Sequence, residues 1–421
     1  MLKRLFFGFI AGLACLPALA QFRVDVSGVG LTQFPIAVLA FRGDDSAPQK
    51  IGGIVQADLE RSGQFRGLDV AGVSLDETSR VDFPAWRQKG VDALVAGSIS
   101  RLADGRFDIR MQLWDVARGQ SLGGQNFAVT AGELRYVAHR IADFVYEKLT
   151  GDKGVFSTRI VYVTKNGKSY SLWVADADGE GAQSALVSPE PIISPSWAPN
   201  GTQVAYVSFE SRKPVIFVHD VASSKRRLVA NFKGSNSAPA WSPDGRTLAL
   251  TLSRDGGAQL YLMDANGGEP KRFAPSSSID TEPTFTPDGK TVYFVSDRGG
   301  SPQIYRVVLA GGNPERVTFT GTYNISPALS RDGKWMAYIS RVSGAFKLHV
   351  MDLASGATTA ITDSVADENP SFSPNSKLII YATQQQGREA LMTTTLDGKI
   401  KARLAGQNGD IREPDWGPVQ K

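Results

Sequence analysis

Residues 21–150 combine the two hydrophobic periods expected of strands and helices. Strands are predicted where residues alternate or run continuously apolar: "FRVDV" from Phe22, "PIAVLAF" from Pro35, "VDALVAGSIS" from Val91 and "RFDIRMQLWDV" from Arg106. Helical spacing appears twice. Residues 51–59 predict a helix whose start we place at residues 46–48, and residues 134–149 predict a second helix, ended by Gly151. We therefore expect a small α/β layer domain whose apolar stripes form its core.

From residue 160 onward the helical spacing disappears and short strands alternate with turns. The phrase "PAWSPDGRTLAL" begins at Pro239, with near-copies from Pro195, Pro283, Pro327 and Pro370 and a stub from Pro414. These prolines are 43 or 44 residues apart, which is the length of one four-stranded propeller blade. In each copy we expect the proline to open a strand, the aromatic residue to pack between sheets, and "SPDG" to form a type I turn.

The two ends of the repeat region complete each other. "RIVYVTK" from Arg159 reads as a second strand with no first strand before it, and "REPDWGP" from Arg412 as a first strand with nothing after it. Together they make one composite blade, which would leave the ring without a free edge. We predict an all-β six-bladed β-propeller over residues 159–421, closed by N- and C-terminal strands and joined to the α/β N-terminal domain by a linker at residues 151–158.

The first twenty residues are typical of an export signal. A basic start, a short apolar stretch broken by Pro17 and the small residues Ala18 and Ala20 predict a signal peptide cleaved after Ala20. The only cysteine, Cys15, is removed with it, so the mature chain has no disulfide or thiol chemistry. No other segment is apolar enough to span a membrane. The formal net charge of +4 gives no case for nucleic-acid binding.

The signal peptide, the α/β domain and the six repeats in this order resemble the TolB family, the periplasmic component of the Tol–Pal cell-envelope system. The resemblance rests on "IGGIVQADLERSGQF", "LRYVAHRIADFVYEKLTG", the "PAWSPDG" repeats and "DGKIKARL", and it covers essentially the whole mature chain. It implies a periplasmic, non-enzymatic adaptor that supports outer-membrane integrity and envelope constriction at cell division. We expect a monomer.

Three patterns that could carry catalysis or metal binding have simpler explanations. "GQSLG" around Ser121 matches G-x-S-x-G but lies between two strands rather than before a helix. His139, His219 and His349 have no partner at metal-ligand spacing. "DADGEG" from Asp176 resembles the start of a calcium loop, but other blades carry a turn at the same place. We predict no catalytic residue, metal site or cofactor.

The residues immediately before the six prolines vary, although the scaffold around them repeats. They are Ser194, Ala238, Glu282, Ser326, Asn369 and Glu413. Since the innermost strands of a propeller run along its axis, we expect these residues to ring one mouth of the channel, and their variation suggests freedom from structural demand. With their neighbours they form a polar rim with an acidic excess. This rim reads either as solvated connectors or as a docking surface, with a weakly held cation among its carboxylates.

The resemblance implies what docks there. In the TolB family this mouth receives Pal, the peptidoglycan-associated lipoprotein, and certain bacteriocins use the same surface; other outer-membrane lipoproteins are further expected partners. The implied Pal-binding residues are Asn236, Ser237, Ala238, Asp280, Thr281, Glu282, Asn324, Ser326, Asp367, Glu368, Asn369, Arg412 and Glu413.

The mature N-terminus is the family's docking strand for the inner-membrane protein TolA. This implies a second set of contacts, made by Phe22, Arg23, Val24, Asp25 and Val26. From the residues alone, the same stretch reads as an edge strand of the N-terminal domain. The two readings are compatible, because a strand that can detach can also extend a partner's sheet.

Two other classes of function compete with the adaptor. A propeller that gates a hydrolase would precede a catalytic domain of some two hundred residues, and the sequence ends soon after Gly417. A small-ligand-binding propeller would line its channel mouth with aromatic residues, whereas the aromatic residues here recur at positions expected to pack between blades.

Overall fold

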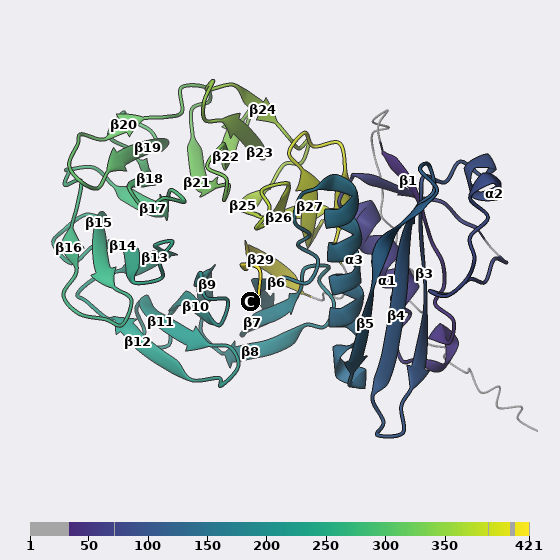
Figure 1. Ribbon diagram of the computed structural model, residues 1–421. Helices are drawn as coiled ribbons and strands as arrows, with labels where there is room; N and C mark the ends of the chain where they lie inside the picture. Colours follow the sequence, from purple (N-terminus) through teal and green to yellow (C-terminus); the bar gives the residue numbers. More distant parts are fainter. Residues whose placement is uncertain (1–32, 71, 386, 405–408, 421) are drawn as a thin grey trace, which may run out of the picture.

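The computed structural model describes residues 33–420 except 71, 386 and 405–408, and these form two domains side by side (Figure 1). A five-stranded sheet with helices is followed by a ring of six four-stranded sheets. The α/β domain and the six-bladed propeller predicted from the sequence are confirmed. The expected signal peptide, its cleavage site after Ala20 and the strand at Phe22 lie outside the described residues. None of the described helices is both long and apolar enough to cross a bilayer.

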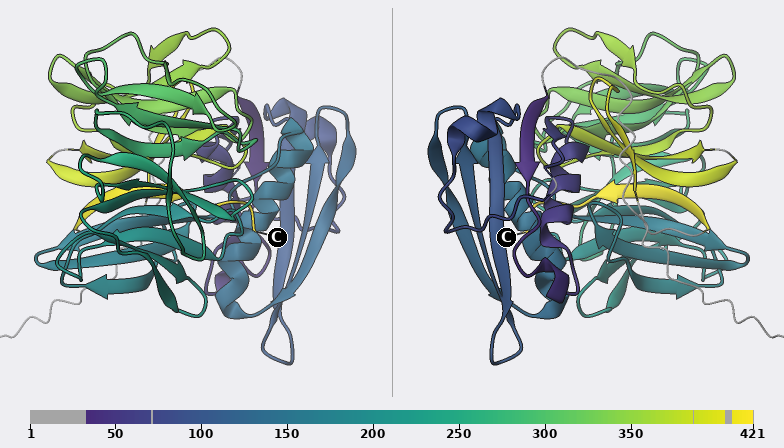
Figure 2. Two further views of the ribbon diagram at one scale, coloured as in Figure 1. Left: turned by 90° about the vertical axis from the view of Figure 1, so that its left-hand side faces the viewer. Right: turned by 90° about the vertical axis from the view of Figure 1, so that its right-hand side faces the viewer.

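The N-terminal sheet has the strand order β2-β1-β3-β4-β5. Its strands are β1 (Phe34–Val38), β2 (Phe65–Gly67), β3 (Ala93–Arg101), β4 (Phe107–Asp115) and β5 (Gln120–Val129). β1 pairs in parallel with β2 and β3, and the remaining pairs are antiparallel. Helices α1 (Ile51–Arg61) and α3 (Leu134–Thr150) lie between this sheet and the propeller (Figures 1 and 2).

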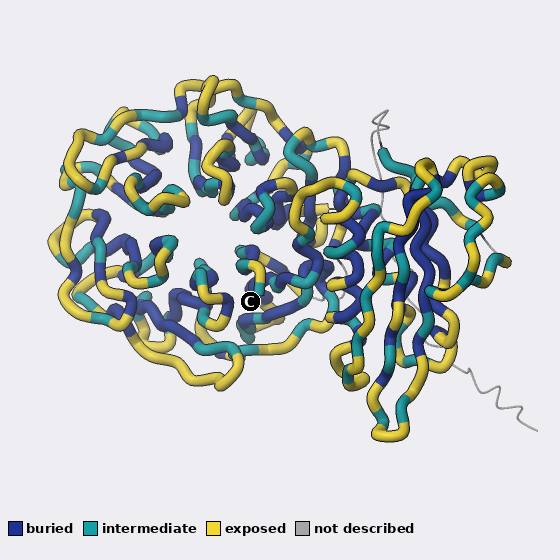
Figure 3. The backbone as a smooth tube through the Cα atoms, viewed as in Figure 1, coloured by how far each residue is buried: buried dark blue, intermediate teal, exposed yellow. Residues whose placement is uncertain are grey.

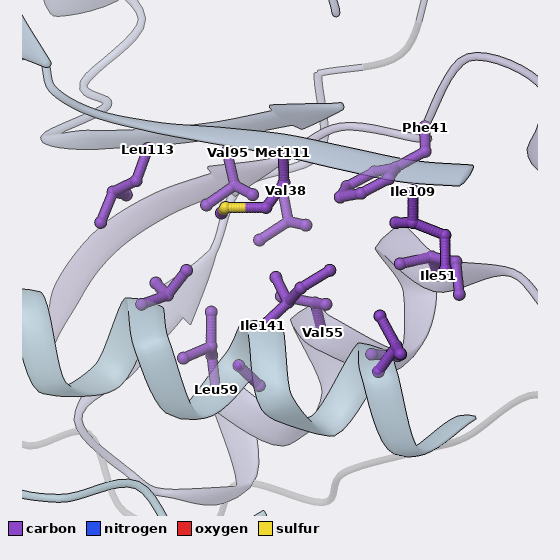
Figure 4. Close-up of a cluster of buried hydrophobic side chains, with 14 of the residues drawn as sticks. Val38, Phe41, Ile51, Val55, Leu59, Val95, Ile109, Met111, Leu113 and Ile141 are labelled. Carbon is purple, nitrogen blue, oxygen red and sulfur yellow. The ribbon is translucent and has the colours of Figure 1, made fainter. Parts of the chain in front are cut away.

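Alternation along the strands gives this sheet a core on each face. Val38 and Val95 point toward α1 and α3, where they meet Val55, Leu59 and Ile141 (Figure 4). Their strand neighbours, including Ala37 and Leu94, form a second cluster on the opposite face. There the short helix α2 (Phe83–Gln88) contributes Trp86.

Helix α1 begins later than the sequence indicated. It starts at Ile51, and the stretch where we placed its start forms a 3-10 turn, Asp44–Ser46, and extended backbone. The buried carboxylate of Asp44 accepts hydrogen bonds from the backbone N–H groups of Ile51 (3.1 Å) and Gly52 (3.3 Å). A cap several residues upstream in the chain therefore satisfies the helix N-terminus, and sequence spacing does not reveal such a cap.

Each propeller blade contains four strands, and the first lies nearest the axis. Blades one to three are β9 (Ile192–Trp197) to β12 (Arg226–Ala230), β13 (Asn236–Trp241) to β16 (Lys271–Arg272), and β17 (Asp280–Phe285) to β20 (Glu315–Arg316). Blades four and five are β21 (Asn324–Leu329) to β24 (Thr358–Ala360) and β25 (Glu368–Phe372) to β28 (Lys401–Arg403). Blade six is β29 (Asp410–Trp416), β6 (Arg159–Asn166), β7 (Ser169–Asp176) and β8 (Gln183–Ser188).

The second and third strands of blades one to five have the following bounds. In blades one to three they are β10 (Gln203–Ser208), β11 (Val215–Asp220), β14 (Thr247–Leu252), β15 (Gln259–Asp264), β18 (Thr291–Ser296) and β19 (Gln303–Val308). In blades four and five they are β22 (Trp335–Val342), β23 (Ala345–Asp352), β26 (Leu378–Gln385) and β27 (Arg388–Thr395).

Blade six is the composite blade that the two ends of the repeat region predicted. β29 pairs antiparallel with β6, with Trp416 opposite Ile160 and Ile411 opposite Thr164. The indole N–H of Trp416 donates to the hydroxyl of Thr158 (2.8 Å), just before β6. The last strand of the propeller thus closes the ring onto its first.

The blades are held together by apolar clusters at their interfaces. One such cluster joins Ala205 and Ile216 of blade one to Leu248 and Leu250 of blade two, and the other pairs of neighbouring blades share similar clusters. Strands are largely buried and loops exposed (Figure 3). As expected, an aromatic residue of the repeat phrase reaches its neighbour: the indole N–H of Trp241 donates to the carbonyl of Ser196 (3.1 Å).

The second half of the junction between the domains, residues 155–158, is largely buried, although the sequence of the junction is polar and contains glycine. Val155 packs into the core between blades five and six, and Phe156 into the core of the N-terminal domain. The carboxylate of Asp143 on α3 accepts a hydrogen bond from the backbone N–H of Phe156 (2.7 Å). Two adjacent residues of the linker therefore pack into different domains. This packing restrains the orientation of one domain relative to the other.

A buried cluster of six charged side chains also joins the domains. His139 on α3 contacts Asp58 on α1 (Nδ1–Oδ2, 2.6 Å), and Arg61 pairs with the same aspartate (2.6 Å). From the propeller, Asp178 pairs with Arg135 (2.6 Å). Asp176, at the end of β7, also contacts Arg135 (3.2 Å). With His139 protonated, three positive charges face three negative charges, so burial leaves no charge uncompensated.

His139 is the group in this cluster whose ordinary pKa lies near neutral pH. Burial by itself would lower its pKa, but the charge of Asp58, the hydrogen bond to that aspartate and the nearby carboxylate of Asp176 (3.6 Å) outweigh burial and raise the pKa of His139 to about 10. The folded state therefore holds the proton more tightly than the unfolded state. The stabilisation is complete below about pH 6.5 and is lost as the pH rises through about 10.

We expect His139→Phe to destabilise the protein by about 3–5 kcal/mol, because Asp58 and the propeller aspartates lose a buried countercharge. Thermal unfolding between pH 7 and 10 should show stability falling with pH in the unmodified protein and falling less in the variant. His349→Phe is the control, because the pKa of His349 is lowered by burial. Parallel pH profiles for the unmodified protein and His139→Phe would contradict this assignment.

Candidate docking site at the channel mouth

The six residues before the repeated prolines share one unusual backbone conformation. Their φ angles lie between 47° and 53°, in the left-handed region, although none is glycine. Each first strand has a β-bulge at this residue and the proline. Two expectations are corrected. The prolines lie at a bulge within the strand rather than opening it, and these positions are not free of structural demand, since all six carry the same strain.

Two of these residues connect neighbouring blades through their side chains. The carboxylate of Glu282 accepts a hydrogen bond from the backbone N–H of Ser326 (2.6 Å), the equivalent residue of the next blade. Glu413 accepts one from the backbone N–H of Ser194 in the same way. Glu282 belongs to blade three and Glu413 to blade six, so the two glutamates stand on opposite sides of the ring.

All six residues line one cavity of about 630 Å³ along the channel. Below them the wall consists of the prolines, a ring of small residues and the aromatic residues of the repeat, including Trp197 and Trp416. The aromatic residues thus both pack between blades and line the channel. We had expected their packing role to argue against a small ligand in the channel, and this expectation is wrong.

Four of the residues implied for partner binding are buried. Asn236, Asp280 and Asn324 are fully inaccessible and Asp367 is 3% exposed. Each holds the loop that carries the chain from one blade to the next: Asn236 donates to the carbonyl of Phe232 (3.0 Å), and Asp367 accepts from the backbone N–H of Leu348 (2.9 Å). Their placement on the accessible rim is corrected, because these side chains satisfy buried backbone and side-chain groups.

The other implied residues are accessible to different degrees. Ser237, Thr281 and Glu368 are half-buried beside the ring. Arg412 is exposed and pairs bidentately with Glu389 of blade five (3.0 and 2.7 Å). The segment from Phe22 to Val26, implied for TolA, lies outside the described residues.

The mouth holds carboxylates in a desolvated setting. Burial raises the pKa of Glu413 to about 7; the N–H of Ser194 and the charge of Arg412 oppose this shift, and the charges of Glu368 and Glu282 add to it. Burial likewise raises the pKa of Glu282 and of Glu368. Within the described residues, none of these three glutamates has an ion pair with a lysine or arginine within 4.0 Å. A cation presented by a partner would therefore find unsatisfied charge here.

Asp415 is a further carboxylate of the channel that the sequence reasoning missed. It occupies the ring of small residues, where the other blades have serine, alanine or threonine, and it accepts hydrogen bonds from the backbone N–H of Trp197 (2.7 Å) and the hydroxyl of Ser371 (2.7 Å). Burial raises its pKa. Comparison of the repeats at this position would have revealed it as the one charged residue.

The patterns set aside as catalysis or metal signals lie elsewhere. Ser121 is in β5, next to the turn from β4, and its hydroxyl accepts a hydrogen bond from the backbone N–H of Gly123 (3.1 Å). Ligand atoms of Asp58, His139 and Asp178 lie within 4.8 Å of one another, as metal ligands could. The spacing of these three residues in the sequence does not predict that they lie close together. Arg61 and Arg135 already pair with the two aspartates.

Comparisons with known proteins cover both domains. The TolB amino-terminal domain family matches residues 22–122, and the TolB beta propeller domain family matches residues 146–420. The Tol-Pal system protein TolB of Albidiferax ferrireducens is 80% identical over 421 residues, which are 100% of this chain and 99% of that protein. This chain belongs to the TolB family.

More distant TolB proteins show the same correspondence. The Tol-Pal system protein TolB of Dechloromonas aromatica is 61% identical over 416 residues, covering 99% of this chain and 97% of that protein. The crystal structure of TolB from Acinetobacter baumannii is 37% identical, covers 94% of this chain and 99% of that chain, and superposes with a TM-score of 0.87. Membership in the TolB family makes the chain a component of the Tol–Pal system of the cell envelope.

The left-handed positions of this TolB-family propeller allow a direct test of strain. We expect Ala238→Gly to leave stability unchanged or raise it by up to about 1 kcal/mol, because relief of the left-handed strain offsets the greater freedom of glycine in the unfolded chain. Ala240→Gly, in the same strand and at an ordinary position, should lose about 1 kcal/mol. Denaturant unfolding measures both. Equal losses in the two variants would show that position 238 is not strained.

Proposed function

We propose that this protein is a non-enzymatic periplasmic adaptor that binds Pal through the channel mouth of the propeller and TolA through its mature N-terminal strand. In this role it links the outer membrane to the inner-membrane complex and supports envelope integrity and constriction at division. Membership in the TolB family and the signal sequence support the location. The observation that carries the proposal is the mouth itself, where six strained positions ring a cavity and two of them, Glu282 and Glu413, carry carboxylates that have no lysine or arginine ion pair among the described residues.

The mouth has the properties expected of a protein-docking surface. Its backbone is held rigid by the bulges and by the contacts of Glu282 and Glu413 with the next blade, so little order has to be gained on binding. Its carboxylates are partly desolvated before a partner arrives. A loop that carries a basic group would complete their interactions, and the rigid ring would select its shape.

We expect Glu282→Arg to weaken binding of Pal without its lipid anchor by at least about tenfold, since the substitution reverses a charge at the rim. Isothermal titration calorimetry measures the affinity. Glu147→Arg, an exposed position on α3 that makes the same change of charge, is the control and should bind as the unmodified protein does. Glu282→Gln is a second variant for the event that Glu282→Arg does not fold, because glutamine keeps a hydrogen-bond acceptor for the backbone N–H of Ser326. Undiminished binding by both folded Glu282 variants would reject the mouth as the Pal site.

The N-terminal strand is tested by deletion. Removing residues 21–30 should abolish binding to the isolated TolA domain, because this segment supplies the strand that extends the partner's sheet. Pal binding and the thermal unfolding of the propeller serve as controls and should persist. TolA binding that survives the deletion would place its docking site elsewhere.

A further inference from the structure

The hairpins at the channel mouth differ between the two halves of the ring. In blades four, five and six the second and third strands have eight residues each, while those of blades one to three have six and are joined by longer loops. The two further residue pairs of blade four lie at the mouth, since Ser340, after which the extension of β22 begins, pairs with Asn324 at the mouth end of β21. A partner that approaches the mouth therefore meets paired strands on one half of the ring and loops on the other.

On the side of the longer strands the cavity extends between blades four and five. We call this extension the side lobe, and its lining residues are Ile325, Ile339, Phe346, Ala366, Asp367 and Glu368. Four of the six are apolar, beside a rim that is polar and acidic. Within the described chain, the residues equivalent to Ile325 and Phe346 in blades one to three do not line the cavity.

The position of Phe346 is set by the backbone on both sides. Its N–H donates to the carbonyl of Val365 (3.0 Å), and its carbonyl accepts from the N–H of Asp367 (3.0 Å), which ties β23 to the loop before blade five. The ring meets Tyr323 edge-on at 6.0 Å, and the guanidinium of Arg341 lies 5.8 Å from its centre. The aromatic surface of the side lobe is therefore fixed before any partner binds.

Exposed apolar residues flank the side lobe. Val342 at the tip of the blade-four hairpin is 39% exposed, and Val365 in the loop to blade five is 61% exposed. Glu368 lines the lobe itself, and Glu282 and Glu413 stand in the adjoining ring. An apolar recess thus lies beside carboxylates that have no lysine or arginine ion pair among the described residues.

We propose that the side lobe is the anchor pocket for the docked partner, which inserts one large apolar side chain there and sets a neighbouring basic side chain against the carboxylates of the mouth. The inference rests on the proposed function, because it assumes that a protein loop enters the mouth. It adds the chemistry that the loop must carry and the blades that select it. Buried aromatic or aliphatic anchors in preformed pockets commonly dominate the binding energy of an interface.

Two substitutions test the anchor pocket with soluble Pal as the probe. Ala366→Trp fills the side lobe from an exposed position, and Phe346→Ala removes its aromatic surface. Each should weaken binding by about 10- to 30-fold in calorimetric titrations. Tyr170→Ala is the matched control. Tyr170 is the second residue of the equivalent eight-residue strand β7, and it also lies beneath a cation, with Lys165 5.9 Å from its ring.

The outcomes separate the side lobe from the mouth as a whole. If Glu282→Arg loses binding while folded Ala366→Trp binds as the unmodified protein does, the side lobe is not the anchor and the proposed function stands. If both bind normally, the mouth is not the docking surface. A loss in Tyr170→Ala equal to that in Phe346→Ala would show a general effect of the eight-residue strands and overturn the assignment to one pocket.

Salt distinguishes the two halves of the proposed contact. The loss caused by Ala366→Trp should be the same at 50 and 500 mM sodium chloride, since it removes apolar burial. The loss caused by Glu282→Gln should shrink as salt screens the charge pair. A loss in Ala366→Trp that disappears at high salt would show an electrostatic contact and contradict an apolar anchor.

Discussion

The pairing of β29 with β6 is the contact on which the rest of the structure depends. It converts a row of sheets with two open edges into a ring, and only a ring encloses a channel. It also brings Glu413 and Asp415, from the end of the chain, into a wall otherwise built from internal repeats. The hydrogen bond between Trp416 and Thr158 links the same closure to the segment that leaves the N-terminal domain. The closure of the ring, the channel and the junction between the domains therefore depend on the same contacts.

Within the ring, backbone and side chains have separate roles. The bulge forces one left-handed residue into every blade, and the surrounding ladder and apolar interfaces hold it there despite the strain. Because the backbone repeats, the side chains at this position can differ without altering the scaffold. Two of the six, Glu282 and Glu413, use this freedom to contact the next blade and to carry charge to the rim. The backbone of the ring is therefore the same in every blade, whereas the side chains at this position differ from blade to blade.

The sequence sufficed for the architecture, because repeat length, turn residues and the two orphan ends are local patterns. It was less informative about which polar residues near the prolines are accessible. Asn236 and Glu282 look equally suited to a rim, yet one is buried by hydrogen bonds to a neighbouring loop and the other faces the cavity. The burial of Asn236 includes a hydrogen bond to the carbonyl of Pro214 (3.1 Å), 22 residues earlier in the chain, which the local sequence does not reveal. The start of α1 was misplaced for the same reason, since Asp44 caps it across a turn.

Blade six joins two regions in which charge is buried. One of its turns supplies Asp178 to the cluster with Arg135 and His139, and its first strand supplies Glu413 to the mouth. In the first region arginines and a protonated histidine balance the aspartates within the chain. In the second no described lysine or arginine pairs with the glutamates. Burial penalises an unbalanced carboxylate much more than a balanced one. The cluster between the domains is therefore complete as folded, whereas the mouth is the place where an external group can still lower the free energy.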